Sequence, residues 1–92
     1  MDNETEIVII STESTYTSEA ICVIRCLSGT ARVGTTFDTH PASGRVIELT
    51  EIEWYGHKVD TLDEMHSGKA HFVGTGAEQL RKYDVLKTPQ KE

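Results

Sequence analysis

Short runs of β-branched and aromatic residues, separated by turn residues, constrain the fold of this chain more than any other feature. Ile7 to Ile10 form an unbroken β-branched run, and later apolar runs are separated by glycines such as Gly29 and Gly56. Valine, isoleucine, threonine and the aromatic residues favour strands because their side chains fit a pleated, half-buried surface. The sequence therefore predicts an all-β domain.

The spacing of these runs predicts where each strand lies. Residues 11–18 are nearly all hydroxyl residues and form either a polar continuation of the first strand or a loop. Gly34 predicts a bend or a bulge, and the broken alternation at Thr50-Glu51 predicts a bulge. Residues 76–82 predict one helical turn with Leu80 packed inward. We expect strands at 6–10, 20–27, 30–38, 45–55, 57–62, 69–75 and 83–86, with a loop at 41–44.

The second predicted strand shows which of its faces points into the core. Residues 20–27 alternate, and Arg25 lies on the odd-numbered face. Because an unpaired guanidinium is costly to bury, the even-numbered face should point inward. The expected core residues of this strand are Ala20, Cys22, Ile24 and Cys26.

A chain of 92 residues and 10.2 kDa predicts one domain with a small core. A small open sheet would leave two unpaired edges, whereas closure into a barrel removes them. We therefore predict a small closed six- to seven-stranded barrel. It comprises an acidic N-terminal segment with the first strand (1–19), the barrel core (20–86) and a polar tail (87–92).

The charge of the chain argues against general nucleic-acid binding. The formal net charge is −6, and residues 1–19 contain acidic side chains and no Lys or Arg. Phosphate backbones are attracted by clustered Lys and Arg, so an acidic domain is a poor general partner for them. A basic edge near the C-terminus could still contact RNA locally.

Cysteine spacing and hydropathy indicate the compartment. Cys22 and Cys26 lie four residues apart, or about 13 Å along a strand. A disulfide needs Cα atoms within about 7 Å, so we expect two buried free thiols, typical of a reducing cytoplasm. No apolar run approaches the roughly 20 residues of a membrane span, and no signal peptide is apparent. We expect a cytoplasmic protein with no membrane partner.

Four segments in order resemble the second domain of translational GTPases. Residues 25–37 (RCLSGTARVGTTF) resemble its G-R-V-x-x-G-x-[IV]-[KR]-V-G-D-x-[FVL] stretch, and residues 49–59 resemble the following V-x-x-I-x-x-x-G-x-x-V hairpin. Residues 65–74 resemble A-x-x-G-[DE]-x-V-x-[LIV]-x-L, and residues 84–86 resemble the closing G-[DQ]-V-L, with Tyr83 in place of its glycine. The resemblance implies the barrel that elongation factor Tu and initiation factor 2 carry beside a GTPase domain, here without that domain.

The sequence offers no constellation typical of catalysis. It lacks G-x-x-x-x-G-K-[ST], so we expect no nucleotide hydrolysis, and no serine occupies a Gly-x-Ser-x-Gly context. His66 and His71 have no recognised metal-ligand spacing. A barrel of this size is filled by its own side chains. We therefore expect no enzyme activity, no metal and no cofactor.

Two aromatic segments are the candidate binding sites. The first lies on one predicted hairpin, where we consider either a Trp54 in the core with Tyr55 on the rim, or exposed rings that anchor a partner. Glu51 and Glu53 would repel phosphate there, which favours a protein of basic character. The second is the basic and aromatic cluster near the C-terminus, a candidate RNA contact. The candidate residues are Trp54, Tyr55, His57 and Lys58 in the first segment and Arg81, Lys82 and Tyr83 in the second.

These observations support two hypotheses from different classes. The first is a non-catalytic, stand-alone β-barrel binding module that docks on a protein partner. The alternative is a ribosome- or RNA-associated accessory factor related to the second domain of translational GTPases. RNA binding that weakens steeply with salt would favour the alternative.

Overall fold

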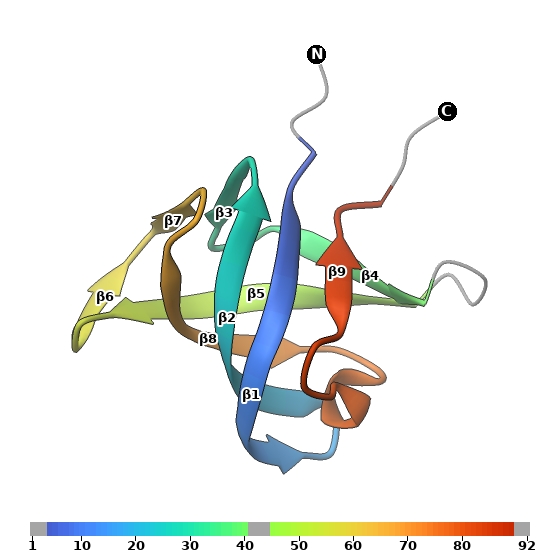
Figure 1. Ribbon diagram of the computed structural model, residues 1–92. Helices are drawn as coiled ribbons and strands as arrows, with labels where there is room; N and C mark the ends of the chain where they lie inside the picture. Colours follow the sequence, from blue (N-terminus) through green and yellow to red (C-terminus); the bar gives the residue numbers. More distant parts are fainter. Residues whose placement is uncertain (1–3, 41–44, 90–92) are drawn as a thin grey trace.

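The computed structural model describes residues 4–40 and 45–89, and most of these residues lie in β-strands (Figure 1). The predicted loop at 41–44 lies outside the described residues. A short 3-10 turn, η1 (Ala77–Gln79), is the helical turn expected near Leu80. The strands are β1 (Glu6–Tyr16), β2 (Glu19–Ser28), β3 (Thr30–Arg32), β4 (Thr36–His40), β5 (Arg45–Trp54), β6 (His57–Val59), β7 (Thr61–Asp63), β8 (Ser67–Val73) and β9 (Val85–Lys87).

Six of these strands close into a barrel, which confirms the predicted fold. The main sheet has the order β4-β9-β1-β2-β8-β5-β6, and β4 also pairs with β5. That additional pairing joins the sheet into a ring and leaves β6 as an extension of β5. β3 and β7 pair with each other as a separate ribbon beside the ring (Figure 1).

The barrel interior is packed with apolar side chains. Phe37 of β4 and Phe72 of β8 meet edge to face, with ring centroids 6.2 Å apart. All buried side-chain nitrogen and oxygen atoms of the described residues have hydrogen-bond partners. The even-numbered face of β2 is confirmed as the inner face. The core residues are Ile7, Ile9, Ala20, Cys22, Ile24, Cys26, Ala31, Phe37, Ile47, Leu49, Ile52, Leu62, Ala70, Phe72, Ala77, Leu80 and Leu86.

The first strand is longer than its apolar run. Residues 11–16 continue β1 as a polar extension paired with β2, with register shifts after Ile9 and Thr12. β1 also pairs with β9 on its other side, so it belongs to the barrel wall. Lys87, placed in the polar tail by the sequence, pairs with Glu6 as the last residue of β9.

The predicted single strand at 57–62 is wrong, because the chain changes partners at Asp60. β6 pairs with β5, whereas β7 pairs with β3. The Val33 amide donates to the Asp60 carbonyl at this crossing (2.9 Å), and Leu62 packs into the core. The bulge predicted at Thr50 is confirmed by a register shift between Leu49 and Glu51 opposite β8.

The two cysteines are free and buried, as expected. Burial raises the pKa of the Cys22 thiol to about 11, and burial also raises the pKa of Cys26. Because the thiolate is the reactive form, we predict that iodoacetamide at about pH 8 alkylates the folded protein about 100-fold more slowly than the urea-unfolded protein. Equal alkylation rates, followed by mass spectrometry, would contradict this burial.

Candidate functional site

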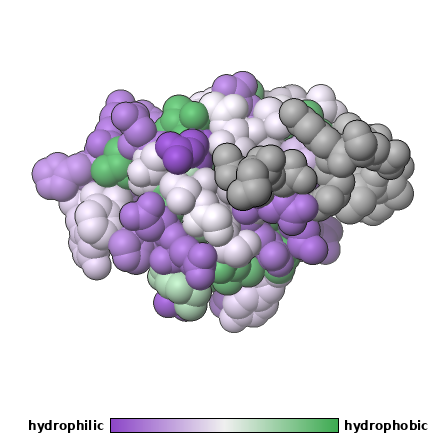
Figure 2. Space-filling model, turned by 90° about the horizontal axis from the view of Figure 1, so that it is seen from above, coloured by the Kyte–Doolittle hydropathy of each residue, from purple (hydrophilic) through white to green (hydrophobic). Residues whose placement is uncertain are grey.

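Because side chains fill the barrel, its outer surface carries the candidate sites. Figure 2 shows one face, seen from above, on which apolar residues form small separate areas among hydrophilic ones. Broad aliphatic docking surfaces are therefore absent from the part of that face that the structure describes. None of the described helical residues forms a segment long and apolar enough to cross a membrane.

An exposed aromatic cluster forms where the β5–β6 turn meets the β7–β8 turn. The indole of Trp54 stacks on the imidazole of His66, with centroids 5.7 Å apart and planes 13° apart. The ring of Tyr55 meets the same indole edge to face at 4.8 Å. Met65, beside His66, is also exposed. We call Trp54, Tyr55, Met65 and His66 the hairpin patch.

The interpretation that places Trp54 in the core is wrong. Ile52, two residues earlier, is buried, and simple alternation would put Trp54 on the same face. However, the β5–β8 pairing ends at Glu53, and beyond it β5 pairs only with β6. Trp54 therefore lies past the barrel rim, where no opposite wall covers it, and 37% of its surface is exposed.

Two members of the hairpin patch hold a backbone conformation that their residue types disfavour. Tyr55 and Gly56 form a two-residue turn with φ of 52° and 79°, a turn that favours Asn-Gly. Met65 has φ of 72°. A left-handed conformation costs a non-glycine residue about 1 kcal/mol. Tyr55 is nonetheless 84% exposed, so burial of its ring does not offset this strain.

The other two hairpin candidates, His57 and Lys58, lie beside the patch rather than in it. His57 pairs with Trp54 across the turn and is exposed. The Lys58 ammonium lies 2.8 Å from a carboxylate oxygen of Glu51. Their mutual hydrogen bond raises the pKa of Lys58 and lowers that of Glu51. The Lys58 side chain therefore points from β6 toward β5.

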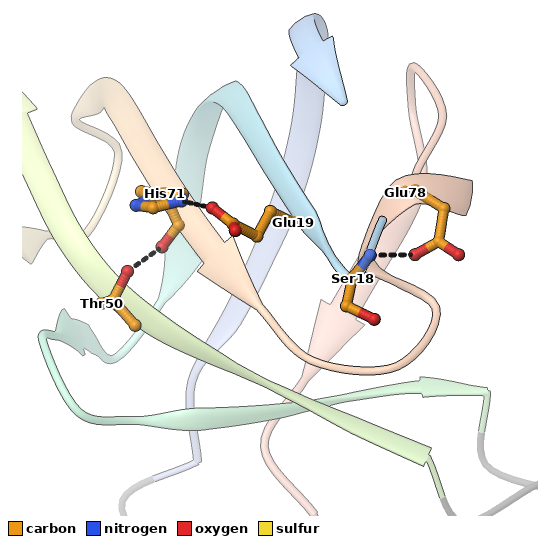
Figure 3. Close-up of polar contacts among 5 residues, drawn as sticks. All are labelled: Ser18, Glu19, Thr50, His71 and Glu78. Carbon is orange, nitrogen blue, oxygen red and sulfur yellow. Dashed lines mark hydrogen bonds and ion pairs between the residues drawn. The ribbon is translucent and has the colours of Figure 1, made fainter. Parts of the chain in front are cut away.

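The remaining polar contacts on the barrel wall tie strands together. Figure 3 shows the Glu19 carboxylate directed at the His71 ring, and their Oε1 and Nε2 atoms are 3.0 Å apart. The Thr50 hydroxyl donates to the His71 carbonyl, and the Ser18 amide donates to Glu78 (Figure 3). His71 is thus separate from His66 of the hairpin patch. Within the described residues, no His, Cys, Asp and Glu group could hold a metal ion.

Arg81, Lys82 and Tyr83 form a second surface, distant from the first. Figure 1 places the β5–β6 turn at the far left and the segment between η1 and β9 at the lower right. The Lys82 ammonium lies 5.0 Å from the Tyr83 ring centroid, and Tyr83 is 69% exposed with φ of 73°. The Arg81 amide donates to Asp84 (2.9 Å). Arg81 also lines an open groove of about 1020 Å³ between η1 and β1.

Sequence reasoning missed Met65 and His66 as neighbours of Trp54. The backbone places them there, because the Met65 amide donates to the Cys26 carbonyl (2.6 Å) and the Cys26 amide donates to the His66 carbonyl (3.0 Å). These bonds anchor the β7–β8 turn to β2, next to the end of β5. The available signal was the glycine that follows them: a Cβ on Gly68 would lie 3.0 Å from the Glu53 carbonyl, which indicates close packing on β5.

Solved structures with the same fold include those of two translation factors. Translation elongation factor SelB from Methanococcus maripaludis, in its apo form, matches with a TM-score of 0.77 and 11% identity over 98% of this chain. GDP-bound aIF5B from Aeropyrum pernix matches with a TM-score of 0.75 and 15% identity over 96% of this chain. This chain corresponds to only 20% of the first protein and 15% of the second.

The comparisons with sequences give no further assignment. No protein-family model matches the chain, and no curated protein matches it. The likeness to the two solved structures is therefore a likeness of fold. Together with the closed ring of strands, it identifies the chain as a β-barrel of the kind found in translational GTPases, which confirms the fold expected from the sequence resemblance.

Proposed function

We propose that this barrel is a non-catalytic binding module that docks on a protein partner through the hairpin patch. The observation that carries the proposal is Tyr55, whose ring is 84% exposed on a backbone with φ of 52°. Asparagine or glycine would hold this turn at lower cost. Strained, exposed residues persist where they serve a function, and tyrosine and tryptophan dominate the energetics of protein interfaces.

The geometry around Tyr55 supports the same role. Trp54 stacks on His66 and meets Tyr55 edge to face, so the rings are ordered before a partner arrives. Preordered aromatic side chains lose little conformational entropy on binding. The filled barrel interior, in turn, favours a module that works through its outer surface.

The test is the substitution Tyr55→Asn. Relief of backbone strain, about 1 kcal/mol, offsets the lost ring contact with Trp54, about 0.5 kcal/mol or more. The free energy of unfolding should therefore stay within about 0.5 kcal/mol of the parent value, as measured by urea denaturation. Affinity for the partner should fall at least about tenfold, because a tyrosine anchor is removed.

The matched control is Tyr16→Asn, which removes another exposed tyrosine, at the end of β1. Affinity capture from a native lysate, with nuclease, should enrich one protein on the parent and on the Tyr16 variant and lose it on the Tyr55 variant. Equal enrichment on all three, or no reproducible enrichment on the parent, would contradict the proposal.

A ribosome- or RNA-associated role is the second candidate. The fold of two translation factors and the cluster of Arg81, Lys82 and Tyr83 favour it. Tyr83 has the same left-handed backbone as Tyr55, and an exposed ring beside two cations can stack on a base. This role requires RNA binding at low salt that weakens steeply as the salt concentration increases. It also requires that nuclease treatment abolish this binding in the affinity capture.

A further inference from the structure

We infer that the partner of the hairpin patch presents a basic segment, whose Lys or Arg side chains contact the aromatic rings and the surrounding carboxylates. This inference rests on the proposed function and specifies its partner by chemistry. It follows from the charge around the patch.

One of the two strongly acidic stretches of the chain lies at this end of the barrel. Residues 51–66 contain five acidic side chains and a single lysine, a formal charge of −4 within a chain total of −6. Asp63 and Glu64 directly precede Met65 and His66 in the β7–β8 turn, and Glu53 directly precedes Trp54. The acidic side chains therefore flank both turns that build the patch.

The one lysine of this segment does not neutralise these carboxylates. Lys58 opposes Glu53 across β5 and β6, but its ammonium lies 2.8 Å from Glu51. Among the ion pairs of the described residues, none involves Glu53, Asp60, Asp63 or Glu64. Glu53 lies opposite Lys58 and Lys69 on the two neighbouring strands, so the carboxylates left for a cationic partner are those of Asp60, Asp63 and Glu64.

The aromatic rings of the hairpin patch provide a second contact for the cations of the partner. A Lys or Arg side chain over an exposed aromatic face gains about 0.5 to 1 kcal/mol, more once water is excluded. Tyr55 offers most of its ring to solvent, and acidic side chains flank the two turns that build the patch. RNA fits this surface poorly, because its phosphates would approach an unneutralised acidic rim.

The inference is tested with two labelled peptides and fluorescence anisotropy. One is a ten-residue peptide in which arginine alternates with glycine, and the other has glutamate in place of every arginine. The arginine peptide should bind the parent protein at least about tenfold more tightly, and an increase from 50 to 300 mM salt should weaken it about threefold or more. Tyr55→Asn should weaken it about threefold to fivefold through the lost cation–ring contact.

Charge-neutralising variants locate the interaction. Asp63→Asn with Glu64→Gln should weaken the arginine peptide about threefold to tenfold, the loss expected for two exposed charge pairs. The matched control is Glu4→Gln with Glu48→Gln, which removes the same charge from exposed positions away from the patch. The control should stay within about twofold of the parent.

The outcomes separate this inference from the proposed function. Equal binding of the two peptides, or equal effects of the two double variants, would overturn the basic partner. If the Tyr55 variant still loses a captured protein in that case, the hairpin patch remains a docking surface for a partner of other chemistry. If the arginine peptide binds and Tyr55→Asn leaves capture unchanged, the proposed docking function fails by itself.

Discussion

Replacement of Ile24 by aspartate should unfold the domain. Ile24 is fully buried on the inner face of β2, in the strand that pairs with both β1 and β8. A carboxylate placed there loses its hydration and finds a purely apolar core, which costs about 4 kcal/mol or more. That cost is comparable with the whole stability of a domain this small, about 5 to 10 kcal/mol. The variant should therefore lose its β circular dichroism at 25 °C.

The control for this variant is Val85→Asp, the same type of change at an exposed position of β9. It should remain folded, with a loss of about 1 kcal/mol or less. A folded Ile24→Asp protein, with a midpoint of urea denaturation near that of the control, would show that the inner face of β2 is misassigned.

Some glycines have neighbours outside the N-terminal segment. Among these, Gly74 should be the one whose replacement by alanine lowers the free energy of unfolding most. Gly74 joins β8 to η1 with φ of 148°, and a Cβ there would lie 2.9 Å from the Ile47 Cα and 2.9 Å from the Val46 carbonyl. Both atoms belong to the backbone of β5 and cannot move without disturbing the sheet. Strain and overlap together should cost about 3 kcal/mol or more in the free energy of unfolding.

The Gly34→Ala variant measures the cost of backbone strain in the absence of steric overlap. Gly34 also has a positive φ, 97°, but nothing lies within 4 Å of the site that its Cβ would occupy. Strain alone should cost about 1 to 2 kcal/mol. Urea denaturation of both variants measures the difference, and equal losses would mean that the close approach of Gly74 to β5 is not a constraint on the fold.

The sequence predicted the barrel because its local signals agreed with the final structure. The alternation in β2 and the bulge at Thr50 each act within one strand, where side-chain periodicity determines the backbone. Gly34 lies instead in the turn that divides the strand expected at 30–38 into β3 and β4, which have different partners. The sequence did not decide whether the polar end of β1 is a strand or a loop, because threonine and serine occur in both exposed strands and loops. Pairing with β2 decided it.

The candidate site could be predicted only in part, for a geometric reason. Tyr55 as an exposed turn residue follows from the glycine beside it, since the turn is a local feature. The stacking of His66 on Trp54 does not, because it requires the β7–β8 turn to be anchored on β2 next to the end of β5. The split of the strand at Asp60 likewise depends on β3, a partner far away in sequence.

The likeness to the two translation factors is a likeness of fold alone. The chains share this fold at 11 and 15% identity, so few residues are common to them. Surface residues are free to diverge under those conditions. Tyr83 in place of the closing glycine is one such residue, and the barrel accommodates it at φ of 73°. The recognition surface must therefore be argued from this chain's own side chains.

The most direct test of the hairpin patch as the working surface is a two-dimensional nuclear magnetic resonance titration of the labelled protein with the arginine peptide. The backbone amides of Tyr55, Met65 and His66 and the indole N–H of Trp54 should show the largest shift changes, with those of β1 and β9 unchanged. Shift changes centred on Arg81 to Tyr83, or none at a saturating peptide concentration, would contradict this account.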